Sequence, residues 1–213
     1  MKKKSFIFIL IFLSPLMELV RYPIIYSTNE PLFHAVVEVL FTFIILISVI
    51  LYLYNKILNK KIIDAFHDNH FNFKLVIIGI ELFLLEVSFV LLTANPHESF
   101  QANLSNLLGY NDSKLLLLCI VASLTLSPIV VELFFRDLIQ SYLKKNFNAK
   151  YAILLSSFIY GISHSLFSII SLAYYILAGV LLGKSREESN GIIAPIVLHC
   201  SWDILMLLMI WIY

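Results

Sequence analysis

The sequence predicts an all-α membrane protein, a polytopic bundle of about seven transmembrane helices within a range of six to eight. Two observations lead to this prediction. Hydrophobic residues make up 60% of the 213-residue chain and charged residues only 14%, whereas soluble domains have about 45–50% and about 25%. The mean hydropathy is +0.90, and the apolar residues gather in runs close to the roughly 20 residues that a helix needs to cross a bilayer.

Seven such runs follow one another, at roughly 5–26, 31–54, 74–93, 114–140, 151–169, 171–183 and 191–213. We expect the first to be an uncleaved span and not a secretory signal. Pro15, Glu18 and Arg21 stand where a signal would have small residues for cleavage. The sixth run is short and nearly continuous with the fifth, which predicts a tight hairpin around Ser165–Ser171.

Basic residues are concentrated in alternate loops, and this pattern predicts the orientation of the bundle. If the seven runs alternate across the membrane, every lysine-rich segment falls on one side. The residues concerned are Lys2, Lys3, Lys4, Lys56, Lys60, Lys61, Lys144, Lys145, Lys150, Lys184 and Arg186. We therefore expect an integral membrane protein with a cytoplasmic N-terminus. The heavy use of Ile, Leu, Phe, Lys and Asn favours a bacterial cell membrane.

Charge and cysteine content exclude several classes of protein. The balance of 15 basic and 14 acidic residues excludes a nucleic-acid binder, which needs a basic surface. Cys119 and Cys200 lie inside apolar runs and are interpreted as small hydrophobic residues. A polar loop near 55–73 is interpreted as solvated, since no ligand spacing in it is specific for a metal. That loop contains Asp64, His67, Asp68 and His70.

Ionisable residues inside the apolar runs are the candidates for function, because each costs roughly 2.5–3.5 kcal/mol near the bilayer centre. Three polar pairs are spaced i, i+4, so each pair lies on one face of its helix. Glu132, His164 and His199 also lie roughly 18–21 Å from a basic residue on the predicted inner side, at 1.5 Å per residue. One shared polar site is therefore expected. The pairs are Glu132 with Arg136, Tyr160 with His164, and His199 with Asp203.

The residues alone leave several roles open for these pairs. Glu132–Arg136 can be a plain ion pair, His199–Asp203 a local hydrogen-bonded pair, and His164 a core histidine. Alternatively Glu132 or Asp203 acts as a base, while the histidines orient water, donate to an oxyanion or bind a divalent metal such as zinc. We interpret Glu38, Glu81 and Glu86 as interhelical partners or cavity lining.

The three pairs resemble the motifs of the CPBP family, which includes type II CAAX prenyl endopeptidases and bacterial Abi bacteriocin-immunity proteins. Its Glu-Glu-x-x-x-Arg motif reads Val131-Glu132-x-x-x-Arg136 here. Its Phe-x-x-x-His motif reads Tyr160-x-x-x-His164, and its His-x-x-x-Asn or Asp motif reads His199-x-x-x-Asp203. The chain then divides into residues 1–110, N-terminal helices with no recognised motif, and residues 111–213, a CPBP/Abi-like membrane core.

The resemblance implies a membrane-embedded endopeptidase that hydrolyses a peptide or membrane-protein substrate near the cytoplasmic side. In the family, the first Glu and the first His activate a water molecule, and the last His with its Asn or Asp stabilises the oxyanion. Both metal-dependent and metal-free mechanisms have been discussed for it, and His164 and His199 would be the metal ligands. Arg136 and Tyr160 would support the site.

One substitution separates this chain from the family pattern: Val131 occupies the position of the first Glu. Adjacent helix residues differ by about 100° around the axis, so Glu132 does not point where residue 131 points. This favours an alternative function, that of a catalytically impaired homologue acting as a bacteriocin-immunity, scaffold or regulatory protein. A transporter is a third reading, although no paired repeat supports it.

Overall fold

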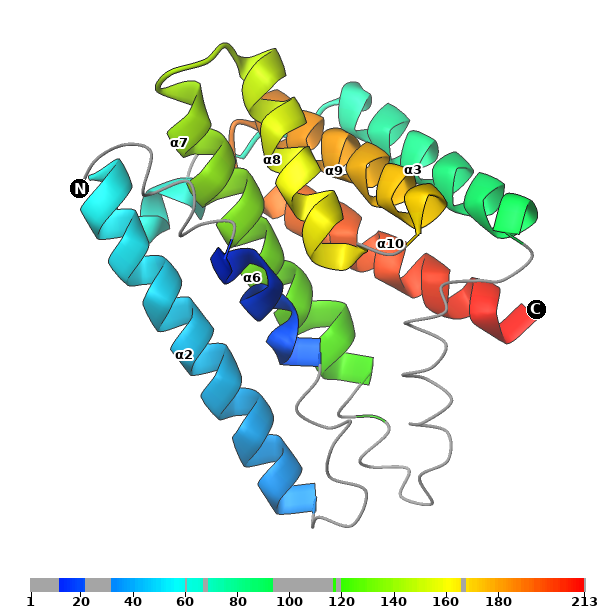
Figure 1. Ribbon diagram of the computed structural model, residues 1–213, viewed down its shortest axis with the longest axis horizontal. Coiled ribbons are helices and arrows are strands. Elements are labelled where there is room, and N and C mark those ends of the chain that lie inside the picture. The colour runs from blue at the N-terminus through cyan, green and yellow to red at the C-terminus, as the bar shows by residue number, and fades with distance from the viewer. Residues whose placement is uncertain are drawn as a thin grey trace.

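The computed structural model describes residues 12–21, 32–59, 61–66, 69–93, 117, 120–165 and 168–212. Within these ranges the chain is helical and forms no β-strand, which confirms the predicted all-α membrane bundle (Figure 1). The principal helices are α2 (Leu32–Leu58), α3 (Phe73–Thr93), α6 (Ser127–Glu132), α7 (Ser141–Lys144), α8 (Ala149–His164), α9 (Ile169–Ser189) and α10 (Ile193–Ile212).

Three of these helices are long and apolar enough to cross a membrane: α2 over Val36–Leu58, α3 over Phe73–Thr93, and α9 over Ile169–Ser189. The last helix, α10, adds a shorter apolar stretch over Ile193–Met209. The first predicted run, 5–26, lies largely outside the described residues. Its described part contains a 3-10 helix, Ser14–Arg21, in which Met17 is buried.

The sixth predicted run, 171–183, was too short, because α9 continues to Ser189. The helix begins where the Ser168 side chain accepts a hydrogen bond from Ser171 N, and it ends before Asn190, whose φ of 55° is left-handed. Its polar last turns stay helical because their side chains find partners on the neighbouring rod. Arg186 pairs with Asp137, and Glu187 pairs with Lys144.

The fourth predicted run forms the central rod of the bundle, from residue 120 to Lys144 (green in Figure 1). Two π-helical stretches, Ala122–Leu126 and Leu133–Gln140, flank α6. Their boundary residues keep right-handed helical angles, so the rod is continuous. Every residue from Val130 to Gln140 is buried. Because π-helical turns bond i→i+5 and often occur at functional sites, this rod brings polar side chains into the core at an altered register.

The predicted hairpin between the fifth and sixth runs is confirmed, since α8 ends at His164 and α9 begins at Ile169. The two helices pack closely at Gly179. A Cβ there would lie 3.0 Å from Ser157 Cβ and 3.1 Å from Ser157 Cα. By contrast, a Cβ on Gly79 would meet only Leu198, at 3.4 Å.

Gly179→Ala is therefore expected to destabilise the protein by about 1–3 kcal/mol, since overpacking a tight contact forces the helices apart. Gly79→Ala is the matched control. It gains the helix propensity of alanine without a clash and should leave the melting temperature unchanged or higher. Thermal unfolding of both variants in detergent measures the difference, and equal melting temperatures would contradict the close packing at Gly179.

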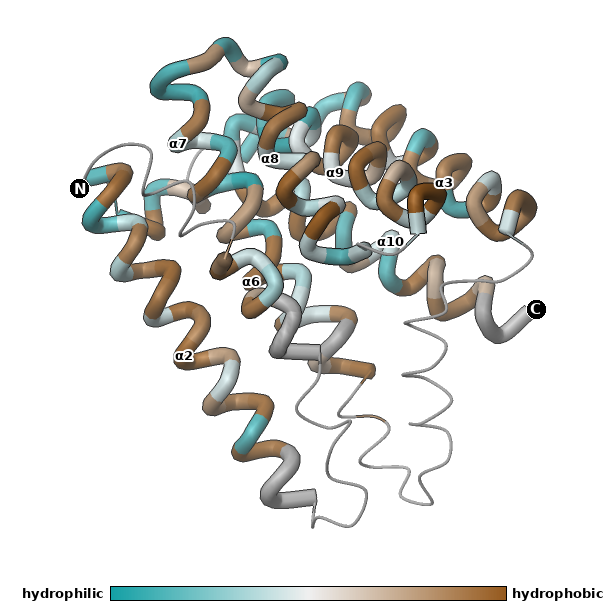
Figure 2. The backbone as a smooth tube through the Cα atoms, in the orientation of Figure 1, coloured by the Kyte–Doolittle hydropathy of each residue, from teal (hydrophilic) through white to brown (hydrophobic). Residues whose placement is uncertain are grey.

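The described lysine-rich segments meet at one end of the bundle, where Lys61, Lys144, Lys145 and Arg186 line one cavity, and we call this the lysine-rich end. Lys2, Lys3, Lys4 and Lys60 lie outside the described residues. Figure 2 shows hydrophilic positions at this end of the bundle. Lys145 Nζ donates to Ile57 O at the end of α2, at 2.9 Å. His70 N donates to Ser189 O at the end of α9, at 2.8 Å. Among the described residues, the structure thus brings together the loops that the alternation of runs placed on one side, while the side of the membrane that they face stays a prediction.

Candidate active site

Glu132 is the centre of a buried polar cluster on the central rod. It lies between the two π-helical stretches, and its side chain has no exposed surface. Its Oε1 lies 2.7 Å from His199 Nδ1 on α10. Its Oε2 accepts from Arg136 Nε at 3.2 Å, one turn along the rod. The first and third motifs, 67 residues apart, thus meet through one carboxylate.

His199 is held in a defined orientation by this contact. A carboxylate only accepts hydrogen bonds, so the Nδ1 atom of His199 carries a proton and donates it to Glu132. The opposite nitrogen, Nε2, lies 3.8 Å from Asp203 Oδ1, which is beyond hydrogen-bond distance. Within the described part of the chain, Nε2 has no hydrogen-bond partner. A neutral His199 therefore presents a basic nitrogen beside a carboxylate.

Arg136 places a fully buried positive charge against the same cluster. Its guanidinium lies over the Tyr160 ring, 4.7 Å from the centroid, a distance typical of a cation–π contact. Its two terminal nitrogens have no hydrogen-bond partner among the described residues. The guanidinium therefore compensates the Glu132 carboxylate and also links it to α8.

Tyr160 and His164 bring the second motif to the cluster. The Tyr160 ring is centred 4.0 Å from the His164 ring and 6.3 Å from the His199 ring. His164 Nδ1 lies 2.9 Å from the carbonyl oxygen of Tyr160, so this nitrogen carries the proton and Nε2 is the basic one. His164 is only partly buried, unlike Glu132 and His199. It is also the last residue of α8, whereas the first turn of α8 lies at the lysine-rich end.

The comparison with protein families agrees with these motifs. Residues 113–205 match the family model described as type II CAAX prenyl endopeptidase Rce1-like. This segment is similar to the Rce1-like family. The resemblance drawn from the three motifs is thereby confirmed, and all six motif residues fall within the Rce1-like segment. Neither the curated proteins nor the solved structures contain a match to the chain.

The Rce1-like segment has no carboxylate at its position 131. Val131 is fully buried in the main apolar core, while the adjacent Glu132 turns to His199 and Arg136. The π-helical turn that follows therefore does not turn the Glu132 carboxylate into the place of the Val131 side chain. The acidic group available to the site from this rod is Glu132.

A second buried network supports the Rce1-like segment from α3. Glu86 is fully buried and accepts hydrogen bonds from the Tyr174 hydroxyl on α9 and from Trp202 Nε1 on α10, the latter at 3.0 Å. Trp202 packs on His199 with ring centroids 5.5 Å apart, and Tyr175 packs on His164 at 4.8 Å. Glu86 thus steadies the aromatic groups behind both histidines.

The sequence predicted only one member of this network, Glu86. Interpreting Glu86 as an interhelical partner is correct. The side chains of Glu38 and Glu81 are exposed, and for these two residues the interpretation as interhelical partners or cavity lining stays a prediction. Nothing in the spacing pointed to Tyr174 and Trp202. In the polar loop, Asp64 and His70 are exposed, whereas His67 and Asp68 lie outside the described residues.

The donor set of the cluster does not fit a tightly bound metal. In the described part of the chain, no three His, Cys, Asp or Glu side chains are grouped so that they could hold a metal ion. In His199, Nδ1 is occupied by Glu132. The described donor set therefore does not match the predicted alternative of a zinc ion held by His164 and His199.

Proposed function

We propose that this protein is a membrane-embedded endopeptidase in which Glu132 and His199 together activate a water molecule. The Rce1-like assignment supports a membrane endopeptidase of the CAAX type in general. The observation that carries the finer proposal is the buried 2.7 Å contact between Glu132 Oε1 and His199 Nδ1. A carboxylate in this position orients the imidazole and stabilises its protonated form, as the acidic residue does in a catalytic triad.

In this mechanism His199 Nε2 removes a proton from water, and the water oxygen bonds to the scissile carbonyl carbon. Asp203, 3.8 Å from Nε2, accepts the second hydrogen of that water. The carbonyl electrons move onto the oxygen, and the Tyr160 hydroxyl donates to the oxyanion. As the oxyanion collapses, the C–N bond breaks and His199 returns its proton to the leaving nitrogen.

These roles differ from those that the family resemblance implied. There the first Glu and the first His activate the water, whereas this chain has Val131 at the first Glu. The partly exposed His164 lies where a substrate enters, at the far end of α8 from the lysine-rich end. Cleavage near the cytoplasmic side is therefore not part of the proposal.

The test is cleavage of a membrane-anchored peptide library, with prenylated CAAX peptides included, by the purified protein in liposomes. We expect His199→Ala to reduce kcat/KM by about 10²–10⁴, the usual contribution of a general base, and His164→Ala to reduce it as well. His70→Ala changes an exposed histidine and should have no effect. Cleavage that survives both His164→Ala and His199→Ala would overturn the proposal.

Val131 favours a second candidate, a non-catalytic immunity, scaffold or regulatory protein on the same fold. As a valine buried in the apolar core, it supplies no carboxylate at the family's first acidic position. A scaffold would keep its cellular phenotype in His164→Ala and His199→Ala. Val131→Glu separates the two candidates further, because a dormant protease gains cleavage from this change and a scaffold does not.

A further inference from the structure

A charged cavity of about 310 Å³ opens at the lysine-rich end, apart from the His199 cluster. It lies between the end of α2, the 3-10 turn Ile62–Phe66, the central rod and α9. Six ionisable residues line it, namely Lys61, Lys144, Lys145, Arg186, Asp64 and Asp137. The lining therefore has four cationic and two anionic side chains, an excess of two positive charges.

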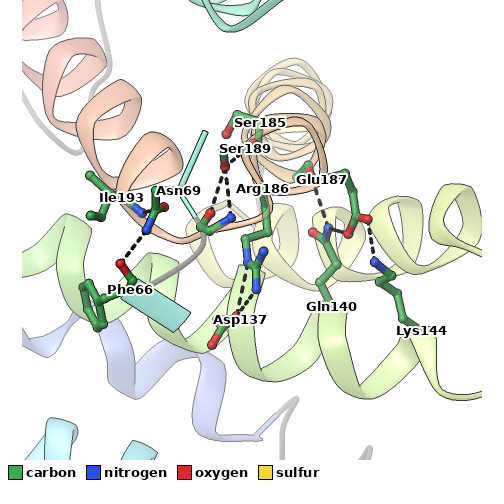
Figure 3. A network of polar contacts seen from close by, with 12 residues as sticks. Phe66, Asn69, Asp137, Gln140, Lys144, Ser185, Arg186, Glu187, Ser189 and Ile193 are labelled. Carbon is green, nitrogen blue, oxygen red and sulfur yellow. Dashed lines mark hydrogen bonds and ion pairs between the residues drawn. The ribbon is translucent and has the colours of Figure 1, made fainter. Parts of the chain in front are cut away.

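The two acidic groups already have partners within the protein. Oδ1 of Asp137 accepts from Arg186 Nε at 3.1 Å and from Arg186 Nη2 at 2.6 Å (Figure 3). Oδ2 of Asp64 accepts from the backbone N of Lys61 at 3.1 Å. Arg186 therefore already compensates the charge of Asp137, and one oxygen of Asp64 already has a backbone donor.

The lysines keep donors for which the described residues supply no acceptor. Each ammonium group has three. Lys145 gives one to Ile57 O, and Lys144 gives one to Glu187, which lies next to the cavity (Figure 3). Even when Glu187 is counted, one positive charge remains in excess. The Lys61 side chain is exposed and adds a further ammonium group at the rim.

The position of the cavity identifies the kind of anion. The apolar span of α2 ends at Leu58, and Tyr54 and Leu58 form one wall of the cavity. Only 22% of the apolar stretch of this span is buried inside the protein, so α2 faces lipid tails along most of its surface. The cavity thus joins an apolar wall to a cationic floor where hydrocarbon gives way to headgroups, an arrangement known to bind anionic headgroups.

We propose that this cavity binds the phosphate of an anionic phospholipid headgroup, with Lys61, Lys144 and Lys145 as donors and Tyr54 and Leu58 against the first acyl carbons. A free phosphate ion has the same anionic chemistry but lacks the apolar part. The proposal is independent of whether the protein cleaves peptides.

The test is thermal unfolding of the purified protein in neutral detergent with phosphatidylglycerol, with phosphatidylcholine of the same acyl chains, or with inorganic phosphate. We expect phosphatidylglycerol to raise the melting temperature by several degrees and phosphatidylcholine to have little effect. Lys61→Glu should weaken the apparent affinity for phosphatidylglycerol at least tenfold. The matched control is Lys184→Glu, a charge reversal at an exposed lysine that does not line the cavity.

Lys61→Gln is a second variant, which removes the charge without adding another. Because the exposed Lys61 side chain makes no hydrogen bond or ion pair with the described residues, both Lys61 variants should melt like the wild type without lipid. Equal stabilisation by the two lipids would overturn the proposal. An equal loss of affinity in Lys184→Glu would indicate diffuse surface attraction and would also overturn it. Stabilisation by inorganic phosphate but not by phosphatidylglycerol would show a site for a soluble anion and would reject a lipid ligand.

Discussion

Replacing Glu132 by methionine is expected to lower the free energy of unfolding by about 3–5 kcal/mol, because it leaves a fully buried guanidinium without its counter-ion. Arg136 receives its compensation from Glu132 Oε2, at 3.2 Å, and neither side chain is exposed. Methionine has a similar volume, so the loss is electrostatic and not due to a cavity. The same change also removes the acceptor of His199 Nδ1.

The double variant Glu132→Met with Arg136→Met separates charge from packing. Replacing a whole buried ion pair by apolar side chains is often nearly neutral, so the double variant should be more stable than Glu132→Met alone. Thermal unfolding of the two single variants and the double variant gives the coupling energy between the side chains. If the two changes in the free energy of unfolding are additive, Glu132 and Arg136 act independently, which would contradict a buried ion pair between them.

Replacing Glu86 by leucine is expected to destabilise the protein by about 1–3 kcal/mol, the cost of leaving a buried donor unsatisfied. The Tyr174 hydroxyl loses the acceptor to which it donates, and Trp202 Nε1 keeps only its 3.0 Å contact with that hydroxyl. Because Trp202 packs on His199, the change should also reduce any activity that depends on His199.

Glu86→Gln is the conservative control, since its amide oxygen can accept the same two hydrogen bonds. Stability and the fluorescence of Trp202 should stay close to the wild type in Glu86→Gln and change together in Glu86→Leu. Exposed Glu81 on the same helix supplies a further comparison, and Glu81→Leu should have little effect. If Glu81→Leu and Glu86→Leu are equally destabilising, the network does not support the bundle.

The polar cluster could be anticipated from sequence because charge is costly in a bilayer. Glu132, His199 and Asp203 stand out in apolar runs, and their i, i+4 spacing shows which helix face must turn inward. The choice of partner could not be anticipated. The i, i+4 spacing predicted only that Glu132 pairs with Arg136. The additional contact of Glu132 with His199 depends on how the central rod packs against α10. The π-helical turns beside Glu132 have no recognised sequence signal.

The helix boundaries show the same limit. The apolar run of α9 ends near Gly183, and hydropathy alone ends the helix there. Its extension to Ser189 depends on Asp137 and Lys144, which are distant in sequence. Glu86 is a similar case, since its apolar surroundings indicated burial but not that its donors come from α9 and α10.

The buried acid on α3 has a consequence for transplanting this protease-like module. Similarity to the family begins at residue 113, so the matched segment excludes Glu86. The two donors to Glu86, Tyr174 and Trp202, lie inside that segment. A chimera that joined residues 113–205 to foreign leading helices would lose the buried carboxylate to which the Tyr174 hydroxyl and Trp202 Nε1 donate. We therefore expect a graft to need α3 as well, so that the transplanted piece is longer than the segment that matches the family.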